Sequence, residues 1–593
     1  MFRPFYAGGC LGDSGMLQAG QLAPVNTSLV SARDAVLARV EQTAQDAASM
    51  KARRQSNKLL LRALKAWKRG ETVPAAKLSL EATNVDETNA QAYHLLAITL
   101  EKLGHLHKAL VTYQKAFQLE PNDPDLILNL GLTAWNTGSM DGAERMFRLY
   151  IETRPDSPEG YNNLASVMRD RGNIQQAIEI IRGAIYRIPN QPMLWNTLAT
   201  ILSEDGRVEE GLVFYEEALR LDPNFARVWH NLGYSYVHLG RYEESFSAYN
   251  SALGLSTNHH ERLEASHSRS ICMMAMGKLE DGFKEYEVRN HHEFRTFVAH
   301  HTKAPRWRGE PLDGKRILLV GEQGLGDEIM FANVLPDLAR AVGERGKLKI
   351  AVDPRLIPIF RRSFPDADIG RYEHAKIEGM EVRICPWALT DGPDYYAQFG
   401  TPLHILRKSL SDFPRQPYLA ADGAKTATFR ARLSALGKGP YVGVCWRSMV
   451  LGAKRGKYFS AIEGWGPVLS TPGITFVNLQ YGDVAAELEL ARETLRVTIH
   501  NFADLNLKDD LEGAAALTSA CDLVLSAPTA AAAMAGALGT EVWFLVAAPV
   551  WPQLGTDHYP WYPKSRVIAC EKFADWDTLM PKVREELIAF ARG

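Results

Sequence analysis

A glycine-rich turn offers the first candidate for acid–base chemistry. The apolar run 317–320 leads into the turn 321–327, Gly-Glu-Gln-Gly-Leu-Gly-Asp, and a helical pattern follows over 329–335. At the carboxyl end of a parallel strand such a turn faces the crevice in which ligands of open α/β sheets bind, and its glycines let a substrate approach the backbone closely. A turn of this composition is also common as a plain tight connection. It delivers one carboxylate, Asp327, to the crevice and carries a second, Glu322.

Basic residues follow a second apolar run, 441–446. Arg447 and Ser448 come directly after it, and a basic loop over 454–458 adds Lys457. A leaving group that carries phosphate gains negative charge as it departs, and fixed cations stabilise that charge. Basic loops are also often only solvated surface, so both interpretations stay open.

Two more β-rich runs end in polar residues. After the first, Gln480 could read the edge of a nucleobase through its amide and Tyr481 could stack on the base, whereas a buried glutamine with satisfied hydrogen bonds is the plainer alternative. After the second, Ser526 and Thr529 precede a helical pattern whose free N–H groups would suit a phosphate. Polar side chains at successive strand ends thus predict a ligand site.

The elements around these residues alternate between β-rich and helical runs, which predicts parallel sheets with helices on both faces. The expected strands are 317–320, 348–352, 367–369, 441–446, 474–479, 523–526 and 542–545, with a short helix over 357–362. We expect two Rossmann-like lobes, residues 305–420 and 421–593. The last helix, whose apolar face includes Leu579 and Val583, should pack against the first lobe.

A 34-residue repeat precedes the lobes. Glycine recurs at this spacing at residues 70, 104, 138, 172, 206 and 240, and again three positions late at Gly277. Small residues stand five positions after each glycine, and mostly aromatic residues stand nine positions after it. The pattern predicts an α-solenoid of about seven tetratricopeptide helix pairs over 56–296, whose concave face binds extended protein chains. We expect residues 1–55 to form a mobile arm with a helical end.

Asparagines recur near one point of the first helix in several repeats. Asn129, Asn163 and Asn231 share the position, and Asn196 stands one residue earlier in its repeat. An amide side chain both donates and accepts hydrogen bonds, so it can hold a peptide backbone whatever the peptide's sequence. The repeats resemble the superhelical domain of protein O-GlcNAc transferases, in which an asparagine ladder at this position holds the substrate chain. Hydrogen bonding within the repeat is the alternative reason for asparagine here.

Composition limits the partners and the location. With 67 Lys and Arg against 69 Asp and Glu, the net charge of −2 gives no reason to expect a nucleic-acid partner. The six cysteines show no Cys-x-x-Cys spacing, so neither a disulfide framework nor a zinc site is indicated. Asp366 and Asp368 have the spacing of metal-dependent transferases but lie in a turn without supporting ligands.

We find no signal peptide and no apolar run long enough to cross a bilayer, and expect a cytoplasmic protein without membrane insertion or a metal.

Residues 325–329, Leu-Gly-Asp-Glu-Ile, followed by Leu335 and Pro336, resemble the opening of heptosyltransferase-like glycosyltransferases. In that family the aspartate of the turn is the proposed base that takes a proton from the acceptor hydroxyl. The resemblance implies this role for Asp327, with Glu322 as the alternative base. It also places Arg447 and Lys457 at the donor phosphate.

The segment after residue 526 departs from that family. Related proteins read Ser-Val-Asp-Thr with a histidine five residues after the aspartate, whereas this chain has Pro528 and Ala533 at those positions. The acidic residue and the histidine contribute to nucleotide binding in the family. The resemblance therefore does not extend to an ADP-type donor.

Three motifs connect the two halves of the chain to one family. They are Gly-Val-Cys-Trp-Arg-Ser at 443–448, Asn-Leu-Gln-Tyr-Gly-Asp at 478–483 and Pro-Trp-Tyr-Pro at 560–563. With the repeats, they make the chain over 56–593 resemble the tetratricopeptide-repeat flagellin glycosyltransferases of alphaproteobacteria. The donor-binding residues implied are Arg447, Ser448, Lys457, Gln480, Tyr481, Ser526 and Thr529.

This resemblance implies an inverting, metal-independent GT-B transferase that serves flagellum biogenesis. The enzyme would move a nonulosonic sugar such as pseudaminic acid from a CMP-linked donor to Ser and Thr of flagellin, without a further cofactor. Two alternatives stay open. One is a heptosyltransferase-like enzyme that acts on saccharide, and the other is a repeat scaffold with an inactive transferase domain, which Pro528 and Ala533 favour.

Overall fold

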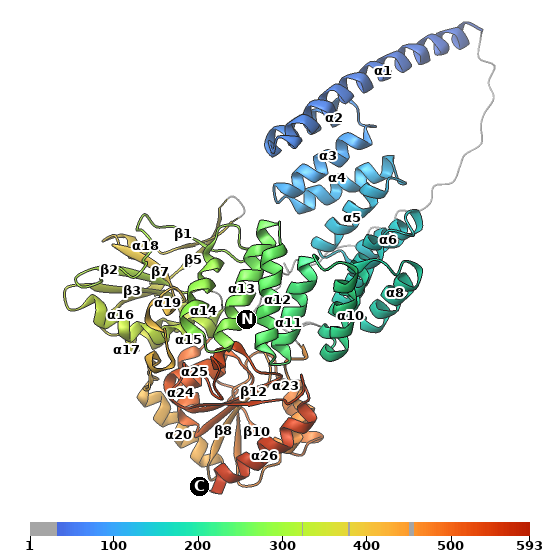
Figure 1. Ribbon diagram of the computed structural model, residues 1–593. Coiled ribbons are helices and arrows are strands. Elements are labelled where there is room, and N and C mark those ends of the chain that lie inside the picture. The colour runs from blue at the N-terminus through green and yellow to red at the C-terminus, as the bar shows by residue number, and fades with distance from the viewer. Residues whose placement is uncertain (1–31, 323, 378–379, 450–455, 593) are drawn as a thin grey trace. The chain divides into compact units, whose positions relative to one another are not determined.

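The computed structural model describes residues 32–322, 324–377, 380–449 and 456–592. The chain divides into two compact units, Met1–Pro189 and Asn190–Gly593. Figure 1 labels helices and strands of the chain and colours them by residue number. The division falls inside the repeat array, whereas the predicted domains separate near residues 296–305. Residues 1–31 of the predicted mobile arm lie outside the described residues.

The first unit consists of consecutive helix pairs. Its helices are α1 (Ala32–Lys68), α2 (Thr72–Val85), α3 (Ala90–Lys102), α4 (Leu106–Leu119), α5 (Pro124–Asn136), α6 (Met140–Thr153), α7 (Pro158–Asp170) and α8 (Ile174–Arg187). The helices of each pair meet at a glycine with positive φ, from 78° at Gly70 to 84° at Gly172, a conformation that favours glycine after a helix end. Helix α1 crosses residue 55 without a break, so the helical part of the arm and the first repeat form one helix.

The second unit begins with the remaining repeats. They comprise α9 (Pro192–Glu204), α10 (Val208–Leu221), α11 (Ala226–His238), α12 (Tyr242–Leu255), α13 (His259–Ala275) and α14 (Leu279–Tyr286), followed by the 3-10 turn η1 (Glu287–Asn290). Gly206, Gly240 and Gly277 again have positive φ, and the rings of Tyr215 and Tyr249, nine positions after the first two, are buried. The predicted repeat is confirmed because glycine and aromatic positions keep their structural roles along the array.

A four-stranded parallel sheet follows, in the order β4-β3-β2-β7. Its strands are β2 (Arg316–Val320), β3 (Lys347–Val352), β4 (Asp368–Arg371) and β7 (Tyr395–Gln398). The nearby helices and 3-10 turns are α15 (Leu325–Phe331), η2 (Ala332–Val334), α16 (Leu335–Val342), η3 (Pro354–Leu356), α17 (Ile357–Ser363), α18 (Pro386–Leu389), α19 (Leu403–Leu406) and η4 (Leu410–Asp412). Side chains of β2 alternate between two faces, with Ile317 and Leu319 in the large core and Leu318 and Val320 in a smaller cluster.

A small sheet, in the order β1-β6-β5, accompanies this first parallel sheet. Its strands are β1 (Ala299–His300), β6 (Met380–Ile384) and β5 (Glu373–Ile377). None of these strands, nor β7, is predicted from the sequence. The exposed side chains of β5 and the short length of β1 explain why no periodic apolar pattern marks them.

The second parallel sheet has the order β10-β9-β8-β11-β12-β13. Its strands are β8 (Tyr441–Cys445), β9 (Thr475–Asn478), β10 (Ile499–His500), β11 (Leu523–Ser526), β12 (Glu541–Val546) and β13 (Ser565–Ala569). The helices and 3-10 turns of this region are α20 (Gly423–Leu436), η5 (Ile462–Trp465), α22 (Gly466–Leu469), α23 (Ala485–Glu493), α24 (Leu511–Ala520), α25 (Ala530–Leu538), η6 (Trp551–Gln553) and α26 (Trp576–Arg592). Numbered along the chain, the six strands lie side by side in the order 3-2-1-4-5-6, which is the order of a doubly wound dinucleotide-binding sheet. The order in which strands are added to the sheet reverses between β8 and β11.

Apolar side chains cover both faces of this sheet. Val524 and Phe544 belong to the core beneath α24 and α25, whereas Leu525 and Leu545 face a separate cluster on the other side. The prediction that the last helix packs against the first lobe is wrong. Helix α26 places its apolar face in the second cluster, against α22, η5 and β13, because that face of the second sheet needs a cover. Within the described residues, no helix is both long and apolar enough to cross a membrane.

Candidate functional site

The turn after β2 places Asp327 in the first helical turn of α15. Asp327 is 6% exposed, and its carboxylate accepts a hydrogen bond of 3.2 Å from the backbone N–H of Gly324. A Cβ added at Gly326 would lie 3.6 Å from Cα of Ala530, so the starts of α15 and α25 are in close contact. The fold therefore brings the candidate base next to the helix that follows Ser526 and Thr529. Gln323 of the same turn lies outside the described residues.

Glu322 lies in a buried ion pair. Its carboxylate accepts hydrogen bonds of 3.0 and 3.1 Å from the Arg289 guanidinium and one of 2.5 Å from the backbone N–H of Gly400. Burial alone would raise the pKa of Glu322, but Arg289 and this N–H group hold it below its ordinary value. Glu322 stays a prediction as the alternative base, with both of its oxygens already occupied by protein donors.

A third carboxylate of this region, Glu328, is missed by the sequence analysis. Glu328 is 1% exposed and accepts hydrogen bonds from the Tyr372 hydroxyl at 2.6 Å and the Asp353 N–H at 3.0 Å, with Arg383 3.8 Å away. Burial raises the pKa of Glu328 to about 7, although Arg383 and the hydrogen bonds act in the opposite direction. Glycine is needed at position 321, since a Cβ there would overlap this carboxylate.

Several polar atoms near the end of β7 have no hydrogen-bond partner among the described residues. They are Nε and Nη1 of Arg383, Nε2 of His300 and Oε1 of Gln398, all buried. Burial lowers the pKa of His300 to about 4, and the charge of Arg383 adds to this shift. Unpaired polar groups are costly inside a protein, so this cluster can hydrogen-bond to ordered water or to a polar ligand at the carboxyl edge of the first sheet.

The second sheet gathers the predicted residues at the point where its strand order reverses. Oε1 of Gln480 accepts a hydrogen bond of 2.9 Å from the backbone N–H of Arg447. Cys445 Sγ lies 3.5 Å from both Gln480 Oε1 and Thr529 Oγ1, and Thr529 is 3.1 Å from the Ser526 hydroxyl. The ends of β8, β9 and β11 therefore form one connected network that contains Arg447, Gln480, Ser526 and Thr529, and donor binding by these residues stays a prediction.

The charged and polar side chains around this network already have protein partners. Arg447 pairs with Glu487, with Nε to Oε1 at 2.7 Å, and a hydrogen bond to Glu487 is the main cause that raises the pKa of Arg447. The Trp446 indole N–H donates to the same carboxylate at 2.8 Å. Ser448 hydrogen-bonds to Tyr481, whose pKa is raised chiefly by burial. Phosphate binding by Arg447 would thus require competition with Glu487.

Lys457 lies apart from this network. Its ammonium group donates to the carbonyls of Ser203, at 3.3 Å, and Glu204 at the end of α9. The neighbouring Tyr458 hydroxyl is 2.7 Å from Nε2 of His238 on α11. The loop therefore attaches the second sheet to the repeats of its own unit. Lys454 and Arg455 of the predicted basic loop lie outside the described residues.

The asparagines of the repeats all contact protein side chains. In the second unit, Nδ2 of Asn231 on α11 donates to Oδ1 of Asn196 on α9 at 3.0 Å. In the first unit, Asn129 on α5 lies 3.0 Å from Nε2 of His94, and Asn163 on α7 accepts a hydrogen bond of 3.1 Å from Asn162. The Asn196–Asn231 contact joins successive repeats, as rungs of a ladder would, and peptide binding by these residues stays a prediction.

The Pro-Trp-Tyr-Pro motif lies in the core that joins the last repeat to both sheets. Trp561 is fully buried, and its ring lies 6.1 Å from that of Phe283 on α14, 5.8 Å from Phe331 on α15 and 5.0 Å from Phe413. Its indole N–H donates to the Pro552 carbonyl at 2.8 Å. Trp561 therefore packs in the core against α14, the end of α15 and Phe413.

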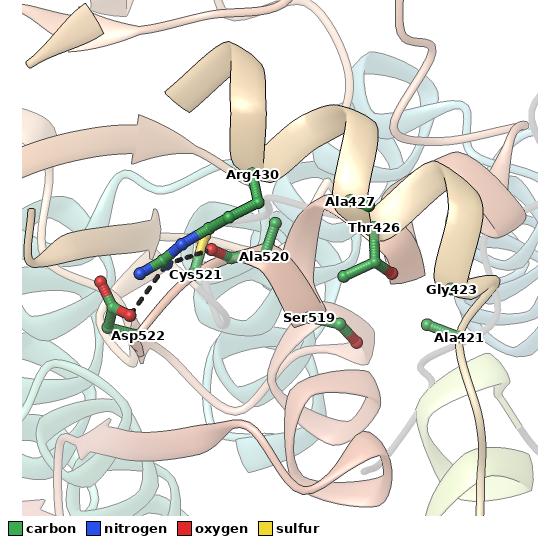
Figure 2. A pocket seen from close by; sticks show the side chains of 9 residues that line it. All are labelled: Ala421, Gly423, Thr426, Ala427, Arg430, Ser519, Ala520, Cys521 and Asp522. Atoms are coloured by element: carbon green, nitrogen blue, oxygen red, sulfur yellow. Dashed lines mark hydrogen bonds and ion pairs between the residues drawn. The ribbon is translucent and has the colours of Figure 1, made fainter. Parts of the chain in front are cut away.

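A pocket of the second sheet lies away from the predicted residues. Figure 2 shows that it is lined by α20 and by the connection between α24 and β11. There the Arg430 guanidinium donates a hydrogen bond of 2.7 Å to the Ala520 carbonyl and forms an ion pair of 2.8 Å with Asp522. Asp522 immediately precedes β11, so the pocket opens at the amino ends of the strands. Ligands of doubly wound sheets bind at the opposite, carboxyl ends.

Known proteins resemble parts of the chain. Protein FlbA of Caulobacter vibrioides is 40% identical over 326 residues, which are 55% of this chain and 55% of that protein. The chain thus spans about half the length of this curated relative. A tetratricopeptide repeat protein from Parabacteroides merdae superposes with a TM-score of 0.35 at 14% identity, over 40% of this chain and 91% of the other. A thermophilic repeat protein of Thermus thermophilus does so with a TM-score of 0.27 at 20% identity, over 30% and 98%.

Models of the tetratricopeptide repeat match consecutive segments of the helical array. The matched residues are 90–123, 128–192, 194–225 and 214–246. These segments extend from the start of α3 into the first turns of α12, and glycine and aromatic residues recur there at the expected positions. The chain therefore contains tetratricopeptide repeats.

Proposed function

We propose that the chain is a cytoplasmic protein O-glycosyltransferase that modifies flagellin. The observation that carries the proposal is the meeting of two helix starts, at Gly326 and Ala530, which brings Asp327 to the carboxyl edge of a doubly wound sheet. Sheets of this order bind nucleotides at the reversal of strand order, and here that point carries Arg447, Gln480 and Thr529. Two such lobes meeting at their strand ends fit the GT-B architecture.

The repeats support a protein as the acceptor. Arrays of this kind bind extended protein chains, and contacts such as that of Lys457 with the end of α9 fix part of the array to the second sheet. The similarity to Protein FlbA supports a flagellum-related role. Holding the acceptor beside the site would make transfer effectively intramolecular.

The proposed reaction is a single inverting displacement. Asp327 takes the proton of a flagellin Ser or Thr hydroxyl, whose oxygen bonds to the anomeric carbon of the sugar as the bond from that carbon to the phosphate oxygen breaks. Arg447 and the N-terminus of α25 stabilise the charge that develops on the departing CMP. We assign a nonulosonic sugar such as pseudaminic acid to the donor. The changed residues Pro528 and Ala533 fit a nucleotide with one phosphate.

Conversion of Asp327 to asparagine tests this proposal. Asp327→Asn keeps a side-chain oxygen for the Gly324 N–H while removing the basic carboxylate, so the start of α15 should persist. With purified full-length protein, CMP-pseudaminic acid and unmodified flagellin, transfer measured by intact mass should fall about 10²- to 10⁴-fold. Asp313→Asn, at an exposed ion pair with Arg345 of the same lobe, is the matched control and should transfer normally. Full modification by Asp327→Asn would remove Asp327 from the mechanism.

The Arg447–Glu487 pair favours a second candidate, a binding scaffold without transferase activity. A cation neutralised by its own neighbour contributes less to phosphate binding than a free one. The two candidates differ in donor turnover by the wild-type protein. A scaffold would bind flagellin and leave the nucleotide sugar intact, whereas the enzyme releases CMP in proportion to the sugar transferred.

A further inference from the structure

Two imidazoles and a carboxylate meet where the repeat array ends. His259 begins α13, and His291 and Glu293 follow directly after η1. His259 Nε2 lies 3.1 Å from Glu293 Oε2, and the rings of His259 and His291 are 5.0 Å apart. One ligand atom from each of the three residues lies within 4.8 Å of the others.

Two further hydrogen-bond contacts hold the three residues in this arrangement. Nδ1 of His260 lies 3.2 Å from the backbone carbonyl of Glu293, which joins the start of α13 to the segment after η1 a second time. The backbone N–H of Glu293 also donates to Nδ1 of His291 at 3.3 Å. The start of α13 and the segment after η1 are thus positioned before any ligand binds.

The chemistry of the three side chains selects a class of ligand. Two histidines and one glutamate, with a water in the fourth position, form a common zinc-binding set, and imidazole nitrogen suits divalent transition metals in general. His259 and Glu293 are 55% and 42% exposed at their side chains, so an ion can reach them from solvent. A simple surface ion pair would involve only His259 and Glu293, whereas here a third ligand, His291, also lies within ligand distance of both.

We propose that His259, His291 and Glu293 bind a zinc ion that fastens the start of α13, in the last repeat, to the segment that follows η1. The bound ion would link α13 to the segment just after Arg289, the residue that holds Glu322 in the turn after β2. The sequence carries a signal for this site that a search for cysteine spacing passes over. The tetrapeptide Asn-His-His-Glu occurs twice, at 258–261 and at 290–293, and each copy supplies part of the ligand set.

Zinc titration of the full-length chain tests the site. The protein is treated with a chelator, dialysed and titrated with zinc chloride alone in a calorimeter. We expect one equivalent to bind, and His259→Ala or His291→Ala to weaken this binding by at least about tenfold, the range that even outer-shell changes reach. His107→Ala, which removes an exposed histidine of α4, is the matched control and should bind zinc like the wild type.

Two further measurements guard against indirect effects. Zinc should raise the melting temperature of the wild-type chain and of His107→Ala but not of His259→Ala, because a ligand that binds the folded state stabilises it. Cobalt in place of zinc should give a visible absorption band that His291→Ala abolishes. The proposal is overturned if the wild-type chain takes up no zinc, or if both histidine variants bind it as tightly as the wild type.

Discussion

The central strands of the two parallel sheets end in different surroundings. After β2, the carboxylates of Glu322 and Glu328 are buried and face Arg289 and Arg383. After β8, β9 and β11, the contacts are mostly between neutral groups, such as the Gln480 amide, with Arg447–Glu487 as the ion pair at their edge. One sheet therefore ends in buried carboxylates that face arginines, and the other ends in a mostly neutral hydrogen-bond network.

The difference shows how each region obtains its order. Charges inside a protein lose their hydration, so every buried carboxylate after β2 needs a partner in an accurate position. Those partners come from other elements, namely η1 for Glu322 and β6 for Glu328. Neutral groups cost less to bury, and the network of the second sheet is built from the residues that end neighbouring strands.

The largest effect should come from removing a positive charge after β2. Arg289→Ala leaves Glu322 buried without its cation, which should lower the free energy of unfolding by about 3–5 kcal/mol. Urea denaturation of the full-length chain measures this change. Arg345→Ala, an exposed arginine paired with Asp313, is the control and should change the midpoint little. Equal midpoints for the two variants would mean that the ion pair does not hold the turn.

Glu328 should make stability depend on pH. Its folded pKa of about 7 lies above the ordinary 4.5, so the folded state binds a proton more tightly than the unfolded chain. The stability from this proton is fully present below pH 4.5 and is lost as the pH rises through 7. Glu328→Gln removes the titration, so relative to the wild type it should gain about 3 kcal/mol between pH 4.5 and pH 8. Parallel unfolding curves of the two proteins across this range would contradict the pKa shift.

A smaller effect is expected at the second sheet, in binding rather than stability. If Arg447 exchanges Glu487 for the donor phosphate, Arg447→Ala should weaken CMP binding about 10- to 100-fold, since hydrogen bonds to charged groups contribute about 1.5–3 kcal/mol. Calorimetry with CMP alone measures the affinity. Arg492→Ala, an exposed arginine of α23 paired with Glu489, serves as the control. If Arg447→Ala and Arg492→Ala both bind CMP as tightly as the wild type, Arg447 does not bind the donor and serves only in its ion pair with Glu487.

The smallest effect should follow from a neutral hydroxyl of the same network. Thr529 caps α25 and accepts a hydrogen bond of 3.4 Å from the Ala532 N–H, so Thr529→Ala should lower the free energy of unfolding by about 1 kcal/mol. Thr529→Ser keeps the hydroxyl and should restore most of the loss. If Thr529→Ala lowered the free energy of unfolding as much as Arg289→Ala, the proposed difference between buried charges after β2 and neutral groups in the second sheet would be wrong.

Patterns of short range were predictable from the sequence. The recurring glycines predict the repeats because a left-handed turn between helices admits little else, and all seven of them have a positive φ. The strands β2, β3, β8, β9, β11 and β12 are predicted because buried strands read as apolar runs. The convergence of Arg447, Gln480, Ser526 and Thr529 follows from the rule that parallel strands end at one edge of a sheet.

Contacts between distant elements were not predictable in this way. Nothing near Glu328 indicates that Tyr372 and Arg383 will enclose it, and nothing near Lys457 indicates that it will bind the end of α9. The lobe against which α26 packs was also predicted wrongly, because an apolar stripe shows that a helix is covered but not by which surface.

The sequence by itself determined the repeat period, the apolar parallel strands such as β2, β8 and β11, and the polar residues that follow them, because these features are written in local patterns of residue type. Only the tertiary structure decided which charges are neutralised. It paired Glu322 with Arg289 and Arg447 with Glu487, and it brought Asp327 to the start of α25. The physical reason is that burial and electrostatic compensation are properties of a position in space, and residues far apart in the chain reach one position only when the chain has folded.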